Sequence, residues 1–208
     1  MYRKIVRRQI RTLLFILILA LPSLLQATDG VRSDSAMIAY LQSEGVSITE
    51  GKRVRLLKSG EEKFDDLFVA IRKARHYIHL EYFNFRNDSI AALLFAELDK
   101  KVQEGVKVRA LFDAFGNWSN NKPLKKRHLK ELAKRGIEIV KFDPLNFPFI
   151  GDFMSRDHRK IVIIDGQMAY TGGMNVADYY IEGLPAFGDW RDMHMRIEGP
   201  AVDELQRI

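Results

Sequence analysis

Hydrophobic residues along this chain alternate between a helical and a strand period. Apolar side chains recur at helical spacing in several segments, which predict helices at 35–41, 61–75, 88–101 and 124–134 and after Pro200. Between them lie short runs rich in β-branched and aromatic residues, which predict strands at 54–57, 77–85, 106–112, 137–142, 161–164, 168–171 and 190–197. Helices alternating with strands favour an α/β fold, with a mixed, largely parallel sheet flanked by helices on both faces.

The first 27 residues have a different pattern from the rest of the chain. Five basic residues stand before an uncharged, mostly apolar stretch at 12–28. That stretch is short for a membrane-spanning helix and typical of a signal peptide, although an uncleaved anchor stays an alternative. We therefore expect a leader or anchor at 1–27, a linker with a short helix at 28–52, and one domain at 53–208 that is truncated at its C-terminus. The expected location is the cell envelope, at the cytoplasmic membrane, with the body exported.

The net charge of the whole chain is +6, but the leader supplies most of it, and residues 28–208 carry only +1. A nearly neutral body does not suggest nucleic acid as a partner. One basic cluster remains in the body, and its members are Lys122, Lys125, Lys126, Arg127 and Lys130. This cluster is interpreted either as a solvated helix face or as a contact for anionic head groups. The chain has no cysteine, so it forms no disulfide.

The strongest chemical signal is the pattern H-x-K-x4-D-x6-G-G-x-N, which begins at His158. If the strand extends back to His158, this residue and Lys160 point to the same face, while Asp165 has the opposite parity and anchors a turn. An imidazole beside an ammonium group suits attack on a phosphodiester, with the cation stabilising charge on the phosphate oxygens. No metal or other cofactor is expected, because the sequence shows no convincing set of metal ligands.

Two glycines and an amide complete the expected phosphate site. Gly172 and Gly173 permit close approach of the backbone and can present N–H groups to an anion, while Asn175 adds a side-chain donor. A nucleophilic histidine also needs an acceptor that fixes its tautomer, and Asp192 is the candidate.

Four weaker candidates accompany the motif. Glu81 and Asp113 lie in or at the end of strands, where either a site role or a structural role is plausible. His194 shares a predicted strand face with Asp192, and His79 is interpreted as an ordinary polar residue. The apolar segment 147–154 just before the motif suits either acyl chains or the core.

These residues resemble the HKD motif of the phospholipase D superfamily. The segments 158–175 and 190–202 are similar to the first motif region of bacterial cardiolipin synthases, and 78–85 and 108–113 resemble earlier strands of that family. The resemblance implies half of an α-β-α sandwich. It also implies transfer of a phosphatidyl group between two phosphatidylglycerol molecules through a phosphohistidine, with release of glycerol. His158 is then the nucleophile or its acid/base partner, Lys160 and Asn175 hold the phosphate, and Asp192 orients His158.

The superfamily uses two such motifs, whereas this sequence contains one. We therefore expect a second half as partner, either in a longer parent protein or in a second copy of the chain, together with an anionic phospholipid and the membrane surface. Two alternatives stay open. One is a phospholipase D or metal-independent nuclease that acts as a homodimer. The other is a non-catalytic envelope protein that binds anionic lipid.

Overall fold

The computed structural model describes residues 34–49, 52–143, 155–186 and 188–208. The chain divides into two compact units, Met1–Ile48 and Thr49–Ile208. The helix α2 (Asp34–Ser43) belongs to the first unit. Within the described ranges, no helix has both the length and the apolar character needed to cross a membrane. The expected leader at 1–27 and the apolar segment 147–154 lie outside the described residues.

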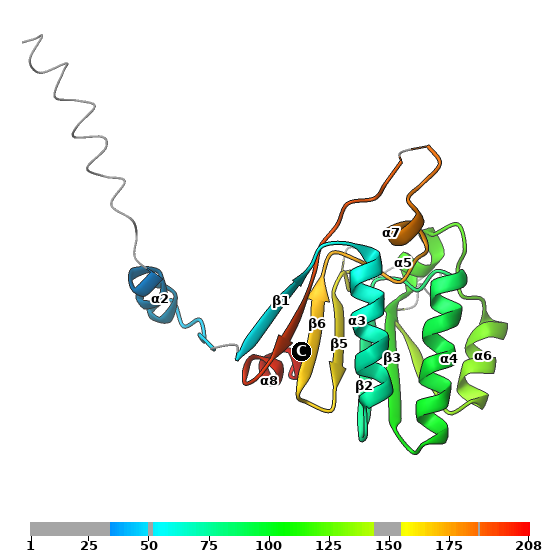
Figure 1. Ribbon diagram of the computed structural model, residues 1–208, viewed down its shortest axis with the longest axis horizontal. Helices are drawn as coiled ribbons and strands as arrows, with labels where there is room; N and C mark the ends of the chain where they lie inside the picture. The colour runs from blue at the N-terminus through cyan, green and yellow to red at the C-terminus, as the bar shows by residue number, and fades with distance from the viewer. Residues whose placement is uncertain (1–33, 50–51, 144–154, 187) are drawn as a thin grey trace, which may run out of the picture. The chain divides into compact units, whose positions relative to one another are not determined.

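The second unit is built on one seven-stranded sheet, which Figure 1 shows with helices packed against it. The strands follow the order β1-β7-β6-β5-β2-β3-β4. Their bounds are β1 (Arg53–Leu57), β2 (Tyr77–Tyr82), β3 (Lys107–Asp113), β4 (Glu138–Phe142), β5 (Lys160–Ile164), β6 (Met168–Gly172) and β7 (His194–Glu198). The expectation of a mixed α/β sheet is confirmed.

Parallel pairing is restricted to one side of this sheet. Only β2, β3 and β4 pair in parallel, and the other four pairings are antiparallel. The sheet is therefore less parallel than the alternation of elements suggested. The reason lies in the connections: a tight turn at Asp165 and Gly166 joins β5 to β6, and so short a link permits only antiparallel neighbours.

Helices lie on both faces of the sheet, in unequal amounts. One face carries α3 (Gly60–Lys73), α4 (Ser89–Gln103) and α6 (Lys126–Lys134), which Figure 1 shows in front of the strands. The short helix α8 (Ala201–Gln206) contacts β5, β6 and β7 and contributes Val202 to a small cluster on the other face. Two further short helices, α5 (Ala114–Ser119) and α7 (Tyr179–Glu182), follow strand ends.

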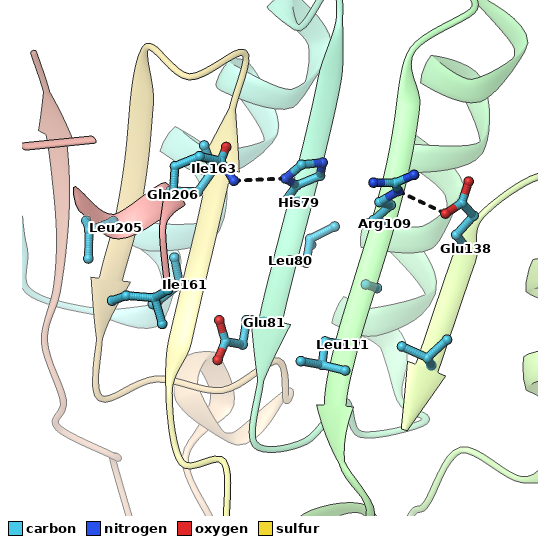
Figure 2. Close-up of a pocket in the computed structure, with 13 residues that line it drawn as sticks. His79, Leu80, Glu81, Arg109, Leu111, Glu138, Ile161, Ile163, Leu205 and Gln206 are labelled. Carbon is cyan, nitrogen blue, oxygen red and sulfur yellow. Dashed lines mark hydrogen bonds and ion pairs between the residues drawn. The ribbon is translucent and has the colours of Figure 1, made fainter. Parts of the chain in front are cut away.

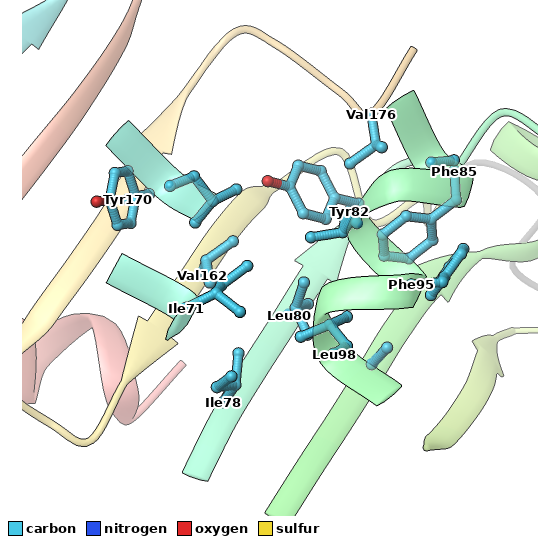
Figure 3. Packing of buried hydrophobic residues seen from close by; sticks show 14 of the residues in the cluster. Ile71, Ile78, Leu80, Tyr82, Phe85, Phe95, Leu98, Val162, Tyr170 and Val176 are labelled. Carbon is cyan, nitrogen blue, oxygen red and sulfur yellow. The ribbon is translucent and has the colours of Figure 1, made fainter. Parts of the chain in front are cut away.

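Alternation along the central strands separates the two cores. In β2, Ile78, Leu80 and Tyr82 belong to the large cluster under α3 and α4, part of which Figure 3 shows. The strand β5 is buried on both faces, because Val162 and Ile164 join the large cluster while Ile161 and Ile163 join the small one. A run of four β-branched residues is what a strand covered on both sides requires.

The predicted strand at 190–197 extends too far toward the motif, because β7 begins at His194 and Asp192 lies outside it. The strand β5 begins at Lys160, so it does not reach back to His158. The alternation argument therefore does not place His158 with Lys160, or Asp192 with His194. The hydrogen bonds between strands end before His158 and Asp192. Tertiary contacts, and not the alternation of a strand, therefore determine where these two side chains lie.

Candidate functional site

The motif residues gather at one edge of the sheet. We call this the site edge, and it consists of the ends of β2, β3 and β6 and the beginnings of β5 and β7. The pairings Tyr82–Lys160 and Gly172–His194 bring these strand ends together. The side chain of His158 is exposed at this edge, whereas Lys160 is only 4% exposed.

Phe83 links the histidine to the lysine. Its ring centroid lies 4.6 Å from that of His158, and the amine of Lys160 lies 5.4 Å from the same phenyl ring. The amine of Lys160 also donates a hydrogen bond of 2.5 Å to the carbonyl oxygen of His158. Gly116 makes room for this arrangement, because a Cβ there would come within 2.9 Å of the Phe83 ring. The sequence offered no signal for Phe83 beyond its place at the end of a strand.

The side-chain amide of Asn175 is buried and held at both of its polar atoms. Its oxygen accepts a hydrogen bond from the backbone N–H of Asn84 at 3.3 Å, and its nitrogen lies 3.4 Å from the hydroxyl of Tyr180. Because the oxygen is already engaged, the NH2 group is the part of Asn175 with capacity left for an anion.

A fully buried lysine supports the loop that carries Asn175. Lys63 is 0% exposed, and its amine donates to the carbonyl oxygens of Met174 at 3.0 Å and Asn175 at 2.9 Å. The same amine lies 4.4 Å from the ring centroid of Phe64. Sequence reasoning missed this residue, although a signal existed. Lys63 falls on the buried stripe of α3, four residues before Leu67, where an amphipathic helix normally places an apolar side chain.

Two buried lysines and a buried histidine lie close together here, with Asp157 and Asp192 as nearby carboxylates. Burial lowers the pKa of Lys160 to about 8, against the opposing influence of Asp157 and Asp192. Burial holds the pKa of Lys63 well below its usual value, while Asp192 raises it. Burial, Lys63 and Lys160 together lower the pKa of His194 to about 2, so this imidazole is neutral. Both ring nitrogens of His194 are buried without a hydrogen-bond partner among the described residues. A site of this kind favours an incoming anion.

The nucleophile candidate is itself sensitive to these charges. Partial burial lowers the pKa of His158, and Lys160 lowers it further, whereas Asp113 and Asp157 raise it. A lowered pKa keeps the imidazole in its neutral form at neutral pH, which is the form that attacks phosphorus.

The two glycines of the motif mainly make room for other groups. A Cβ on Gly173 would lie 2.2 Å from a carboxylate oxygen of Asp192, and one on Gly172 would lie 2.7 Å from a ring nitrogen of His194. The N–H of Gly173 donates to the carbonyl oxygen of Met193 at 3.0 Å, so it is not available to a phosphate as expected. Gly172 has a φ of 155°, which favours glycine.

Asp192 stands beside this loop rather than on His158. Its carboxylate accepts the N–H of Met193 at 2.6 Å, and no hydrogen bond joins it to His158 among the described residues. Its charge acts on Lys160 and Lys63. The structure therefore brings Asp192 to the site edge without showing the orienting contact that the sequence suggested.

Asp113 connects the site edge to the motif segment. One of its carboxylate oxygens caps α5 by accepting the N–H of Gly116 at 2.8 Å. The other accepts the N–H of Asp157 at 2.9 Å, directly before His158. Asp157, a buried residue that sequence reasoning missed, accepts the N–H of Arg159 at 3.1 Å. These contacts fix the backbone on either side of the histidine.

Glu81 lies on the face of the sheet opposite α3. Its carboxylate pairs with Arg159 at 3.1 Å, and burial raises its pKa. A cavity of about 390 Å³ touches both Glu81 and His158. A second pocket of about 310 Å³ lies over the open sheet face, where Figure 2 shows His79 bonded to Gln206 and Arg109 to Glu138. The first cavity is lined by His158 but not by Lys160 or Asn175, and the second is lined by none of these three residues.

Asp165 lies at the other end of β5, away from the site. Its carboxylate accepts the backbone N–H groups of Arg75, His76 and Tyr77 at 2.8, 2.8 and 2.9 Å. It joins β5 to the beginning of β2, which is a structural role.

Comparison with known proteins identifies the family. The model described as "Cardiolipin synthase, PLD-like domain" matches residues 67–183. The chain is 42% identical over 155 residues to a cardiolipin synthase of Geobacillus sp. (strain WCH70), covering 74% of this chain and 30% of that protein. It is 39% identical over 169 residues to the probable cardiolipin synthase YwiE of Bacillus subtilis, covering 81% and 33%.

A solved structure agrees in fold. The phosphatidylserine synthase of Haemophilus influenzae superposes with a TM-score of 0.61 at 16% identity, over 77% of this chain and 36% of that one. These findings define a phospholipase D-like fold, and the chain belongs to the cardiolipin synthase family of PLD-like domains. It spans about a third of the length of the curated relatives that it matches.

Proposed function

We propose that this chain supplies one catalytic half of a phosphotransferase that makes cardiolipin from two molecules of phosphatidylglycerol. A ring nitrogen of His158 attacks the phosphorus atom, a P–N bond forms, and the P–O bond to the leaving glycerol breaks. The glycerol takes a proton from an acid/base group. In the second step the glycerol hydroxyl of another phosphatidylglycerol loses its proton and attacks phosphorus, which breaks the P–N bond and releases His158.

One observation carries the proposal: an exposed, neutral histidine stands beside buried cationic groups that lack sufficient counter-ions. Lys160 and the NH2 group of Asn175 are proposed to bind the phosphate oxygens, and Lys63 adds to the positive potential. Fixed donors and cations in a site shielded from water stabilise the charge that develops during phosphoryl transfer. In this proposal Asp113 and Asp157 influence His158, Asp192 acts on Lys160, and Gly172 and Gly173 shape the loop.

The acid/base group for glycerol is proposed to come from a second half, because the sequence contains one H-x-K-x4-D pattern. The remaining length of the matched relatives or a second copy of this chain would supply it. The proposed partners are anionic phospholipids and the membrane surface, and no nucleic acid or cofactor is included. The leader at 1–27 is proposed to direct the body to the exported side of the cytoplasmic membrane, within the cell envelope, as a signal peptide or a membrane anchor.

Trapping the covalent intermediate tests this function. Full-length protein is incubated with phosphatidylglycerol, quenched and digested, and the peptide containing His158 is examined by mass spectrometry. We expect an added phosphatidyl group and release of glycerol, and both should disappear in His158→Gln. The matched control is His76→Gln, which alters an exposed histidine at the opposite end of the sheet. Turnover that survives in His158→Gln would overturn the proposal.

A further inference from the structure

An exposed aromatic side chain stands beside a group of basic residues next to the site edge. Trp118 on α5 is 72% exposed, and its ring lies 5.6 Å from that of Phe115. Lys122, Lys125, Lys126 and Arg127 follow within nine positions and are all exposed. Within the described parts of the chain, no carboxylate forms an ion pair with any of these four cations. We call Trp118 and these four residues the α5–α6 surface.

The surface is held together by a buried amide. The side chain of Asn117 is only 4% exposed, donates to the carbonyl oxygen of Leu124 at 3.1 Å, and accepts the N–H of Leu124 at 2.8 Å. This pair of bonds folds the segment after α5 back onto the helix, so the lysines lie near Trp118. A buried amide with both of its polar atoms engaged fixes a loop in one conformation.

The same helix is attached to the motif. Asp113 caps α5 with one carboxylate oxygen and holds the N–H of Asp157 with the other, one residue before His158. These two hydrogen bonds of Asp113 therefore connect α5 to the segment that carries His158. The α5–α6 surface therefore has a fixed position relative to the catalytic site.

Its chemistry matches that of an anionic bilayer. Lysine and arginine side chains near a surface of anionic lipid gain electrostatic attraction, and tryptophan prefers the level of the head groups. Other exposed apolar side chains lie near the start of β7 and on α7, namely Trp190, Met193 and Ile181 at 41%, 40% and 36% exposure. In Figure 1, α5 and α7 lie at the same end of the sheet. Met193 and Ile181 are aliphatic, so they suit acyl chains and offer no ring on which a base could stack.

We propose that the α5–α6 surface docks on an anionic lipid bilayer and brings the site edge to the head groups. This inference rests on the proposed function for its choice of lipid, but it concerns binding rather than turnover. Trp118 enters the interfacial region, and the four cations pair with lipid phosphates. The docked orientation presents His158 to substrate that is still in the membrane.

The chain contains two tryptophans, which permits a direct test. In the 208-residue chain with Trp190→Phe, Trp118 is the single tryptophan reporter. Vesicles of phosphatidylglycerol whose acyl chains carry bromine should quench its fluorescence and shift it to the blue, whereas phosphatidylcholine vesicles should not. In the same background, Lys125→Glu with Lys126→Glu should raise the lipid concentration needed for half-maximal quenching by about thirtyfold. This is the loss of affinity expected when two cations are removed from an anionic lipid surface.

The matched control reverses Lys73 and Lys107, which are exposed at the opposite end of the sheet. Quenching should stay unchanged in Lys73→Glu with Lys107→Glu, even though the net charge changes equally. The proposal is overturned if Trp118 is not quenched by vesicles that bind the protein, or if both double variants behave alike. It is also overturned if the surface binds a single-stranded oligonucleotide in preference to the vesicles. Normal docking without glycerol release would refute the proposed function alone.

Discussion

The two ends of the sheet differ in the partners of their buried polar groups. Away from the site, Asp165 accepts three backbone N–H groups, and the amine of Lys101 is satisfied by the carbonyl oxygen of Arg72 and by Glu104. At the site edge, Lys63, Lys160 and His194 are buried together, and both nitrogens of His194 lack a partner among the described residues. The difference lies in charge: Lys101 pairs with a carboxylate, whereas Lys63 and Lys160 form no ion pair within the described residues.

This difference has an energetic meaning. Burying a charge without sufficient partners destabilises a fold, and the group responds by a shift of its pKa. The lowered pKa values of Lys160 and Lys63 show that cost at the site edge. A phosphate would supply the missing negative charge. The comparison therefore separates residues that stabilise the fold from residues that are proposed to bind phosphate. Substitutions at the first end should lower stability, and substitutions at the site edge should lower turnover or phosphate affinity.

Lys160→Met should have the largest effect on function with little effect on stability. Loss of one fixed donor to a developing charge lowers turnover about 100- to 1,000-fold. The folded pKa is about 8, and the unfolded amine keeps its proton to about pH 10.4. Stability therefore rises with pH across this window, and the charged amine destabilises the folded state below it. Thermal unfolding at pH 7 should show no loss of stability, and a large loss would contradict the comparison.

Asp165→Ala should have the opposite profile. It leaves three backbone N–H groups without their acceptor, which should lower the free energy of unfolding by about 2–4 kcal/mol. Urea unfolding measures this change, and the exposed Asp203→Ala is a control expected to stay within about 0.5 kcal/mol of the wild type. Phosphate affinity of the folded fraction should be unaltered. A selective loss of phosphate affinity would mean that Asp165 belongs to the site after all.

Two buried lysines allow a matched comparison of smaller effects. Lys63→Met and Lys101→Met each remove a buried amine from a helix on the same face of the sheet. We expect similar losses of stability, because each variant removes hydrogen bonds of comparable number. Only Lys63→Met should weaken binding of inorganic phosphate, by about tenfold, since one charge-assisted support of the Asn175 loop is lost. Equal phosphate affinity in the two variants, measured by calorimetry, would refute a positioning role for Lys63.

His194 should have an effect on the pH dependence of stability that is visible only in acid. Its folded pKa is about 2, whereas the unfolded side chain takes up a proton near pH 6.5. Its contribution to stability is present above pH 6.5 and is lost as the pH falls below that value. His194→Gln should reduce the acid slope of the unfolding free energy by up to one proton, and His76→Gln should not. An unchanged slope in His194→Gln would show that the imidazole is not buried as described.

The sequence identified most of the elements and the central motif, because hydrophobic period and fixed spacing are local properties. The helix at 88–101 and the strand at 161–164 appear close to where they were expected. Tertiary contacts could not be predicted from the sequence in the same way, because they join residues that are far apart in the chain. Phe83 becomes a site residue only through its contacts with His158 and Lys160, and the N–H of Gly173 is used by Met193 across the sheet. Lys63 could have been found, since a charged residue on a buried helical stripe is itself a signal.

The central claim is that the site edge holds a buried cation that lacks its anion, and titration of Lys160 tests it most directly. Carbon-13 at the ε position of lysine reports each amine by NMR, and Lys160→Met assigns the signal. We predict a pKa near 8 in the free protein, which rises when inorganic phosphate binds. An ordinary lysine pKa of about 10.4 that phosphate does not change would contradict the account.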